Sequence, residues 1–252
     1  MRKHAPVLAA LATSMLMVSC AADPAGAKEQ TTMSAATQGA SAMPFHDPAI
    51  VPLAEAVARG DVARIRALAP ATDLSAHGED DVTLLEWAIW SQKPAALAAL
   101  LEAGADATVL GMDHETVAHM AAMVNDPEYL QVLIDHGAPV DIPRRGLNWS
   151  PIFRAVESGR DAQVDMLIAA GVDLHRTDSM GDSLLHLAAD INDAHRVLQL
   201  LEAGVDPRQT NHSGATFQAS LFAGSDARLN AKGKADRQKV REWLAAHGVP
   251  QQ

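Results

Sequence analysis

The hydrophobic and polar positions of this chain repeat with a period close to 33 residues. Each period holds two short apolar stretches at helical spacing, separated by a polar break. In residues 182–206, a first helix is predicted to begin after Ser183, which can cap it, and a second to end before Gly204. Neither helix could bury its apolar face alone, so the pattern predicts that copies of the unit stack side by side.

The predicted starts of the first helix recur at nearly equal distances along the chain. They fall at Val51, Thr83, Thr116, Ser150, Ser183 and Thr216, separated by 32, 33, 34, 33 and 33 residues. Two residues before each later start lies a residue that tolerates positive φ, which predicts a tight turn. These turn residues are Asp81, His114, Asn148, Gly181 and Gly214.

The second helix of each period has its own signature. An aliphatic pair is predicted to build a continuous core, and a glycine to end the helix. The pairs are Leu100/Leu101, Leu133/Ile134, Leu167/Ile168 and Leu200/Leu201, and the glycines are Gly104, Gly137, Gly171 and Gly204.

Composition and charge narrow the fold class and the partners. Aromatic residues make up only 4% of the 252 residues although 48% are apolar, and alanine fills the difference, which favours closely packed short helices over a large sheet. The net charge of −11 argues against a nucleic acid or an anionic membrane as partner of the folded part. A basic or neutral protein suits this charge better.

The N-terminal segment has the pattern of an export signal. A basic start at Arg2 and Lys3 precedes an apolar run that is too short to span a membrane. The residues Met17-Val18-Ser19-Cys20 resemble the lipobox of bacterial lipoproteins, although Met17 replaces the usual leucine. The resemblance implies cleavage after residue 19, lipid on Cys20, and anchoring in the outer membrane facing the periplasm. An ordinary signal peptide with an incidental cysteine is the alternative.

The composition divides the chain into three parts. Residues 1–19 form the predicted signal peptide, and residues 20–43 the lipidated cysteine and a polar, disordered tether. Residues 44–252 form the repeat domain. A single cysteine in the whole chain fits a protein whose thiol carries lipid rather than a disulfide.

The repeating unit resembles the ankyrin repeat, which reads G-x-T-P-L-H-x-A-A and then x-x-V-x-x-L-L-x-x-G-A-D. The chain has SLLHLAA from Ser183, SPIFRAV from Ser150 and LLEAGAD ending at Asp106. The resemblance implies an all-α solenoid of about six helix-turn-helix repeats joined by β-turns or hairpins, with a concave face that binds a partner. It also implies that His119 and His186 bond the backbone of a neighbouring turn.

The two ends depart from this pattern. Ala71 stands where the first unit should have its terminal glycine, which suits a capping repeat. In the last unit a polar loop over residues 224–236 is expected before a closing helix from Arg237 to His247. Val240, Trp243 and Leu244 should face the core from this helix.

Enzyme and metal chemistry find little support in the sequence. His114, Glu115 and His119 resemble the zinc-protease pattern H-E-x-x-H but carry one residue too many, so the two imidazoles would lie about 140° apart around a helix. The chain is therefore predicted to have no catalytic residue, no metal and no cofactor. The alternative to a binding protein is an enzyme or metal protein that uses His119, His175, His186 and His195.

The candidate contact residues lie at the turns and on the outward side of the first helices, the positions that face the concave side in ankyrin repeats. They are Trp90, Met112, Asp113, Met123, Leu147, Trp149, Glu157, Asp182 and Asp190. Trp and Met are common interface anchors, and the acidic residues nearby favour a basic partner. Trp87 and Met120, one turn away, are expected to belong to the core.

These patterns favour a monomeric, non-enzymatic ankyrin lipoprotein of the periplasm that binds another protein with a basic and apolar surface. Similar bacterial proteins can act as antidotes that neutralise toxic effectors such as lipases. The alternatives are a role in oxidative-stress defence and a structural spacer of the envelope.

Overall fold

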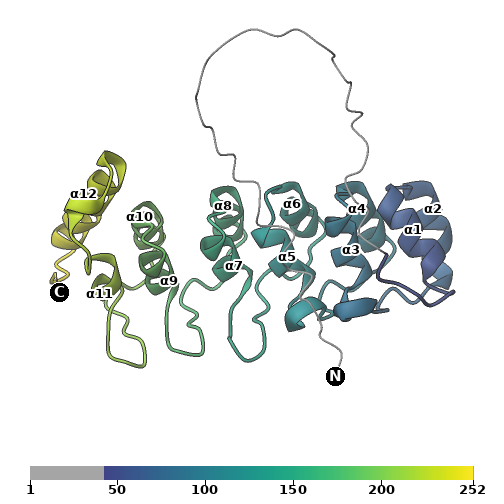
Figure 1. Ribbon diagram of the computed structural model, residues 1–252, viewed down its shortest axis with the longest axis horizontal. Helices are drawn as coiled ribbons and strands as arrows, with labels where there is room; N and C mark the ends of the chain where they lie inside the picture. The colour runs from purple at the N-terminus through teal and green to yellow at the C-terminus, as the bar shows by residue number, and fades with distance from the viewer. Residues whose placement is uncertain (1–42, 252) are drawn as a thin grey trace, which may run out of the picture. The chain divides into compact units, whose positions relative to one another are not determined.

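The computed structural model describes residues 43–251, and within them helices pair into a row (Figure 1). The predicted signal peptide, the predicted lipidation site Cys20 and the tether up to residue 42 lie outside the described residues. Over residues 43–251 six helix pairs follow one another and no strand is formed, which confirms the prediction of an all-α repeat solenoid. No helix in this part of the chain is long and apolar enough to cross a membrane.

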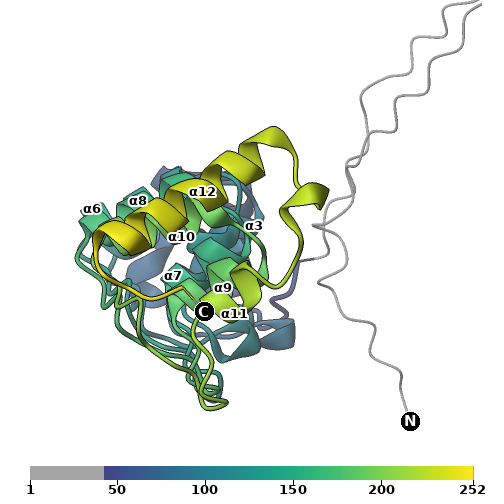
Figure 2. The same cartoon turned by 90° about the vertical axis from the view of Figure 1, so that its left-hand side faces the viewer.

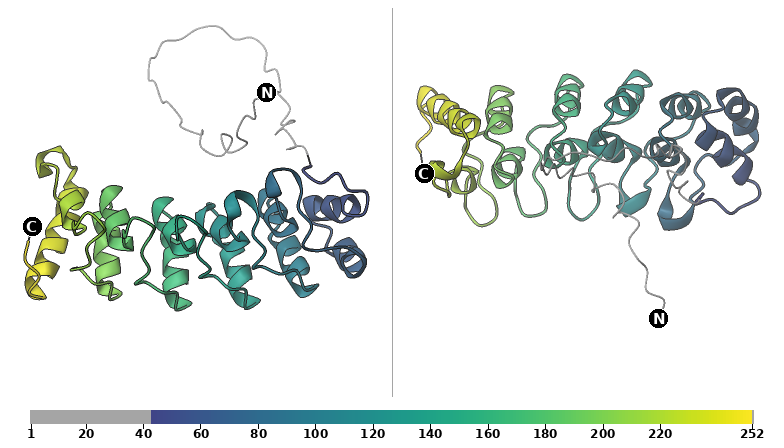
Figure 3. Two further views of the ribbon diagram at one scale, coloured as in Figure 1. Left: turned by 90° about the horizontal axis from the view of Figure 1, so that it is seen from below. Right: turned by 45° about the horizontal axis from the view of Figure 1, so that its top comes forward.

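The first helices of the pairs form one layer of the row. They are α1 (Val51–Arg59), α3 (Leu84–Trp90), α5 (Val117–Met123), α7 (Pro151–Glu157), α9 (Leu184–Asp190) and α11 (Gln218–Leu221). The second helices form the other layer: α2 (Val62–Leu68), α4 (Pro94–Glu102), α6 (Glu128–Asp135), α8 (Asp161–Ala169), α10 (Ala194–Glu202) and α12 (Ala231–Ala246). Views from two further directions show this order (Figure 3).

Extended turns connect each pair to the next and project from the side of the first helices, as the view along the row shows (Figure 2). We call them fingers: the first spans residues 76–83, the second 109–116, the third 141–150, the fourth 174–183 and the fifth 207–216. The first two contain short 3-10 turns, η3 (Glu79–Asp81) and η4 (Met112–His114), and isolated antiparallel bridges join His77 to Thr83 and Leu110 to Thr116. A further 3-10 turn, η2 (Ala69–Ala71), ends the first pair.

The predicted caps of the first helices are confirmed in three repeats and wrong in two, because Ser150 lacks the bond and Phe217 rather than Thr216 precedes α11. Thr83, Thr116 and Ser183 each cap their helix, together with the side chain three residues later. Ser150 makes no side-chain bond to its helix. In the first repeat Val51 is the first helical residue, so no hydroxyl caps α1.

The core runs between the two layers. Leu100, Leu133, Leu167 and Leu200, the leading members of the predicted aliphatic pairs, are fully buried. Of their partners Leu201 is buried, whereas Leu101, Ile134 and Ile168 are half-buried and pack against the same core. The predicted terminal glycines have positive φ, from +68° at Gly137 to +95° at Gly204, as a left-handed helix ending requires.

The last repeat differs from its predicted boundaries. Helix α12 begins at Ala231 rather than Arg237, because the side chain of Asn230 accepts a hydrogen bond from the backbone N–H of Gly233 and caps the helix there. The connecting loop is therefore shorter than expected and contains the 3-10 turn η5 (Asp226–Arg228). As predicted, Val240 and Leu244 are buried. Trp243 is half-buried and stacks on His247.

Candidate partner-binding face

The fingers are closed by short backbone hydrogen bonds across their bases. Gly111 donates to the carbonyl of Glu115 at 2.7 Å, and Asp178 donates to the carbonyl of Asp182 at 2.9 Å. The five turn residues predicted to tolerate positive φ all adopt it, with values from +59° to +80°. Each finger is thus a tight turn with a defined backbone.

Hydrogen bonds also join neighbouring fingers. The backbone N–H of Ser179 donates to the carbonyl of Leu147 at 2.9 Å, and the side-chain amide of Asn148 donates to the carbonyl of Thr177 at 2.6 Å. The backbone N–H of His212 donates to the carbonyl of Met180 at 3.0 Å. The third, fourth and fifth fingers therefore form a connected surface whose backbone is already ordered.

Apolar side chains are exposed on this surface. In residues 43–251 the large hydrophobic side chains that are exposed are Leu147 (41%), Met180 (62%) and Ile191 (42%). Leu147 and Met180 occupy equivalent positions in adjacent fingers, three residues before Ser150 and Ser183, and Ile191 follows the end of α9. Leu147 and Met180 belong to fingers and Ile191 to the end of the first helix α9, so the exposed apolar side chains come from the fingers and the layer of first helices.

The structure places the other predicted apolar contact residues deeper. Trp90, Met112 and Trp149 are half-buried and pack against the core, and Met123 is half-buried. The expectation that Trp87 belongs to the core is confirmed: it is 5% exposed and its indole N–H donates to the carbonyl of Ala54 at 3.0 Å. Met120 is half-buried and also packs against the core.

Four contacts fix Trp149, three through its side chain and one through its backbone carbonyl. Its ring stacks on Phe153 at 5.9 Å, and the guanidinium of Arg154 lies 5.2 Å from its centroid. The indole N–H donates to Asp178 at 3.4 Å, and the Trp149 carbonyl accepts a hydrogen bond from His119 at 3.0 Å. Trp149 is therefore a half-buried residue of the third finger whose ring is fixed against α7.

Arg154 belongs to an ion-pair network that the sequence patterns did not predict. Its guanidinium binds the carboxylate of Glu115, which is 6% exposed, at 2.5 Å and 2.9 Å, and also binds Glu157 at 2.9 Å. Arg144 adds a longer contact to Glu115 at 3.4 Å. Glu157, predicted to contact the partner, is exposed but anchored to Arg154. A buried Glu just before a cap, with arginines in the next repeat, is the signal that could have indicated this network.

The predicted acidic residues are distributed unevenly over the same side. Asp113 and Asp190 are exposed, whereas Asp182 is half-buried and accepts a hydrogen bond from the Asn211 side chain at 2.8 Å. The first finger exposes three consecutive acidic residues, numbers 79–81. Acidic groups therefore gather at the first and second fingers and apolar ones at the third and fourth.

Comparison with known proteins establishes the family. The ankyrin repeat profile matches residues 113–142. Protein PhlB of Serratia liquefaciens is 40% identical over 154 residues, which cover 61% of this chain and 68% of PhlB. The chain belongs to the ankyrin repeat family. Ankyrin repeat proteins bind other proteins, and the comparisons indicate no catalytic family.

Other relatives of this ankyrin repeat protein share only its repeat region or its fold. E3 ubiquitin-protein ligase KEG of Arabidopsis thaliana is 36% identical over 133 residues, 49% of this chain but 8% of KEG. An ankyrin repeat domain from Acinetobacter baumannii superposes with a TM-score of 0.65 at 24% identity, over 79% of this chain and 98% of the other. A chain in the complex of a predatory endopeptidase with an immunity protein from Bdellovibrio bacteriovorus gives 0.61 at 21% identity, over 75% and 97%.

Two buried histidines of this ankyrin repeat protein, His119 and His186, form hydrogen bonds with its backbone. Nδ1 of His119 accepts from the Thr116 N–H at 3.1 Å, so its proton lies on Nε2, which donates to the Trp149 carbonyl. His186 makes the same bonds to Ser183 and to the Ala215 carbonyl, which confirms the backbone role implied for both histidines. Burial lowers the pKa of His119.

The structure does not bring the four histidines of the metal hypothesis together. His175 and His195 are exposed, and His119 and His186 are buried in different repeats. Within residues 43–251 no group of three or more His, Cys, Asp or Glu side chains could hold a metal ion.

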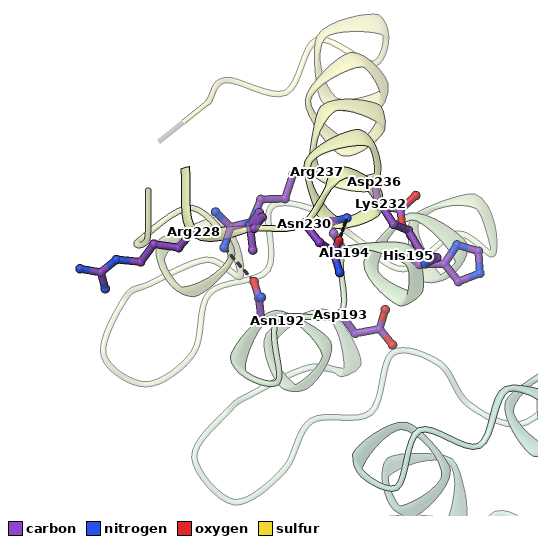
Figure 4. Close-up of a pocket in the computed structure, with 11 residues that line it drawn as sticks. Asn192, Asp193, Ala194, His195, Arg228, Asn230, Lys232, Asp236 and Arg237 are labelled. Carbon is purple, nitrogen blue, oxygen red and sulfur yellow. Dashed lines mark hydrogen bonds and ion pairs between the residues drawn. The ribbon is translucent and has the colours of Figure 1, made fainter. Parts of the chain in front are cut away.

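A pocket of about 330 Å³ lies where α10, η5 and α12 meet (Figure 4). Its polar groups are largely occupied by one another. Arg237 donates to Asn192 at 2.7 Å and Lys232 binds Asp236 at 2.9 Å. Asp193 accepts from the Arg196 N–H at 3.0 Å and so caps α10. The bond between Arg237 and Asn192 joins the last helix to the repeat before it, so the pocket lies at the contact between the last two repeats.

Proposed function

We propose that this ankyrin repeat protein is a lipid-anchored periplasmic binding protein that neutralises a toxic enzyme by covering it with its finger side. The observation that carries the proposal is the origin of the exposed large apolar side chains of residues 43–251: Leu147 and Met180 lie in adjacent fingers, and Ile191 lies at the end of a first helix. Exposed apolar residues gathered on one side of a protein are typical of an interaction site.

Burial of these side chains would supply a useful part of the binding free energy. Complete burial of a Leu or Met side chain contributes about 1.5–3 kcal/mol, and Leu147 and Met180 still expose 41% and 62% of their surface. Their fingers are hydrogen-bonded to each other, so little ordering is needed on binding. The fixed ring of Trp149 in the same finger as Leu147 adds an aromatic contact of the kind found at interface hot spots.

Charge favours a particular orientation of the partner. The exposed carboxylates of residues 79–81 and Asp113 lie on the first and second fingers, before the apolar pair in the row. A partner with an apolar patch beside a basic one complements this arrangement, and attraction between the charged parts would speed association.

Two observations support the antidote role. The structure that pairs an immunity protein with its endopeptidase includes a chain with the same fold, so an ankyrin surface of this kind is compatible with such complexes. The N-terminal sequence, with its export signal and Cys20, supports retention on the outer membrane, where an incoming or newly secreted enzyme would be met.

The proposed face is tested by capture from the periplasm of the source bacterium with the full chain. Leu147→Ser combined with Met180→Ser should abolish capture of the partner. A matched control, Leu198→Ser with Met166→Ser, changes the same residue types on the layer of second helices and should leave capture intact. Thermal unfolding establishes that both variants fold. Equal loss of capture in both pairs would rule out the finger side as the contact.

The antidote role needs a separate measurement. The captured partner should be a secreted enzyme whose activity falls when the purified ankyrin repeat protein is added in equimolar amount, and its expression without this protein should be toxic. A partner without such activity would refute the antidote role and leave the binding face standing. Cys20→Ser should move the protein from the membrane fraction to the soluble periplasm, and an unchanged distribution would contradict the lipid anchor.

A further inference from the structure

The second repeat carries a buried carboxylate where other repeats have a histidine. Glu86 lies three residues after its cap Thr83, just as His119 and His186 lie three residues after theirs. It is 1% exposed. One carboxylate oxygen accepts the backbone N–H of Thr83 at 2.8 Å and its hydroxyl at 3.0 Å. Glu86 therefore completes the cap of α3 with a group that can carry a negative charge in the interior.

The same carboxylate reaches the second finger. The backbone N–H of Met112 donates a hydrogen bond to Glu86. The carboxylate also lies against Gly111 so closely that a Cβ there would come within 1.9 Å of its oxygen. The glycine is required by this close approach rather than by its backbone angles, since its φ is −110°.

The direction of this bond sets the second repeat apart. His119 and His186 donate to a carbonyl of the following finger, whereas Glu86 accepts from an N–H of it. A histidine in that role is neutral and stays compatible with burial. A carboxylate is charged in water at neutral pH, so its burial opposes ionisation. The link between α3 and the second finger is thus the one of these three that depends on a carboxylate.

Burial raises the pKa of Glu86 to about 7, although the hydrogen bonds from Thr83 and Met112 act in the opposite direction. In the unfolded chain the same carboxyl group has its ordinary value of 4.5. The protonated form is therefore the one that the closed structure favours.

We propose that Glu86 positions the second finger, residues 109–116, and makes its order depend on pH: the finger is held closed when Glu86 is protonated and opens more often when Glu86 is ionised. Opening would let water reach the carboxylate, and an ionised carboxylate gains more from water than a neutral one. The population of the open finger should therefore rise with pH and approach its upper limit once the pH exceeds the value in the closed structure.

The charged groups around Glu86 do not reverse this direction. His77 of the first finger, which bonds the Leu110 carbonyl at 2.8 Å, favours the ionised form when it is positive. Asp113 and His114 of the second finger are exposed to solvent, as are the charged residues of α1. Glu115 of the second finger is buried, but its charge is paired with Arg154 and Arg144. On α5, His119 is bonded to Thr116 and Trp149 and its pKa is lowered by burial. Desolvation remains the largest influence on Glu86.

The consequence for binding rests on the proposed function, because the second finger carries the predicted contact residues Met112 and Asp113. An acidified periplasm would present an ordered second finger, and an alkaline one a looser finger. The core of the proposal concerns the finger itself and can be tested without a partner, so its failure is distinguishable from failure of the proposed function.

The test is amide hydrogen exchange of the full chain at pH 5.5 and pH 8, with rates corrected for the intrinsic effect of pH. Amides of residues 109–116 should lose protection on the order of tenfold between the two pH values, as expected for a carboxyl group that shifts from about 4.5 to about 7 on closure. Amides of the fifth finger, residues 207–216, serve as an internal control, because His186 takes the place of Glu86 in the bond to that finger.

Glu86→Gln keeps the shape and removes the titration, so the pH dependence of the second finger should disappear. Should this variant fail to fold, the carboxyl ¹³C shift of Glu86 in the unchanged protein gives an independent readout. A titration midpoint near 7 supports the proposal, and a midpoint near 4.5 overturns it. Equal protection at both pH values, or a pH dependence that survives in Glu86→Gln, would also overturn it.

Discussion

Ser150 offers a direct test of how the repeats are stabilised, because it stands at a cap position but its hydroxyl makes no hydrogen bond to the helix. Its hydroxyl is fully buried and has no hydrogen-bond partner among the described residues. In the third and fifth repeats the equivalent hydroxyls of Thr116 and Ser183 contact a histidine at 3.0 Å and 2.9 Å. In the fourth repeat Phe153 occupies the histidine position, so the hydroxyl of Ser150 lost its partner while remaining buried.

The substitution Ser150→Ala should therefore stabilise the protein or leave it unchanged. A buried hydroxyl without a partner costs about 1–3 kcal/mol relative to a satisfied one, so its removal should raise the free energy of unfolding by about 1 kcal/mol. The matched control Ser183→Ala removes a hydroxyl that caps α9 and contacts His186, and should lower the free energy of unfolding by about 1 kcal/mol. The two substitutions are chemically identical and should have opposite signs.

Urea unfolding followed by far-UV circular dichroism measures both variants, and thermal unfolding provides a second readout. A change of 1 kcal/mol should move the midpoint temperature by about 2–4 °C for a domain of this size. Destabilisation of Ser150→Ala by as much as Ser183→Ala would refute the reasoning, since it would mean that Ser150 makes a stabilising bond after all.

Three further substitutions probe other links. Gly181→Ala should lower the free energy of unfolding by about 1–3 kcal/mol, and by more than the control Gly214→Ala. Both glycines have φ near +80°, but only at Gly181 would the new Cβ contact the next finger, where His212 lies 2.8 Å away. Arg154→Met leaves the carboxylate of Glu115 buried and should cost about 3 kcal/mol in urea unfolding, much of it recovered by adding Glu115→Gln. Burial lowers the pKa of His119 below its ordinary 6.5, so its contribution to stability is present above pH 6.5 and is lost as the pH falls. In His119→Gln the free energy of unfolding should therefore decrease less on acidification below pH 6.5.

The repeat architecture could be predicted because it depends on local spacing. Glycines such as Gly104 end second helices wherever they recur, and Leu100 and its equivalents mark the core at the same phase of each unit. The turn residues also follow from local backbone preference, which is why even His114 and Asn148 adopt the expected positive φ. The start of α12 was misplaced because its cap, Asn230, lies in an insertion with no counterpart in the other repeats.

The side chains of the candidate site were harder to predict, because their exposure depends on contacts between repeats. The sequence indicated that Trp149 was a free anchor, but its ring packs on Arg154 and Phe153 of α7. The partners of Glu115 lie 29 and 39 residues further along the chain. The sequence period predicts where each residue lies in its repeat, but not which side chains form ion pairs between repeats. Met180, the most exposed of the large apolar residues, was not among the predicted contact residues.

The replacement of the histidine by Phe153 also bears on how neighbouring repeats are connected. Trp87 bonds the first repeat to the second through the Ala54 carbonyl, and His119 and His186 bond the third to the fourth and the fifth to the sixth. Between the fourth and fifth repeats the layer of first helices has only the packing of Phe153 at that position. The hydrogen bonds between the third and fourth fingers therefore take over the connection of these two repeats on this side. Leu147 and Met180 lie on opposite sides of that connection, so a partner bound across both would act as a splint.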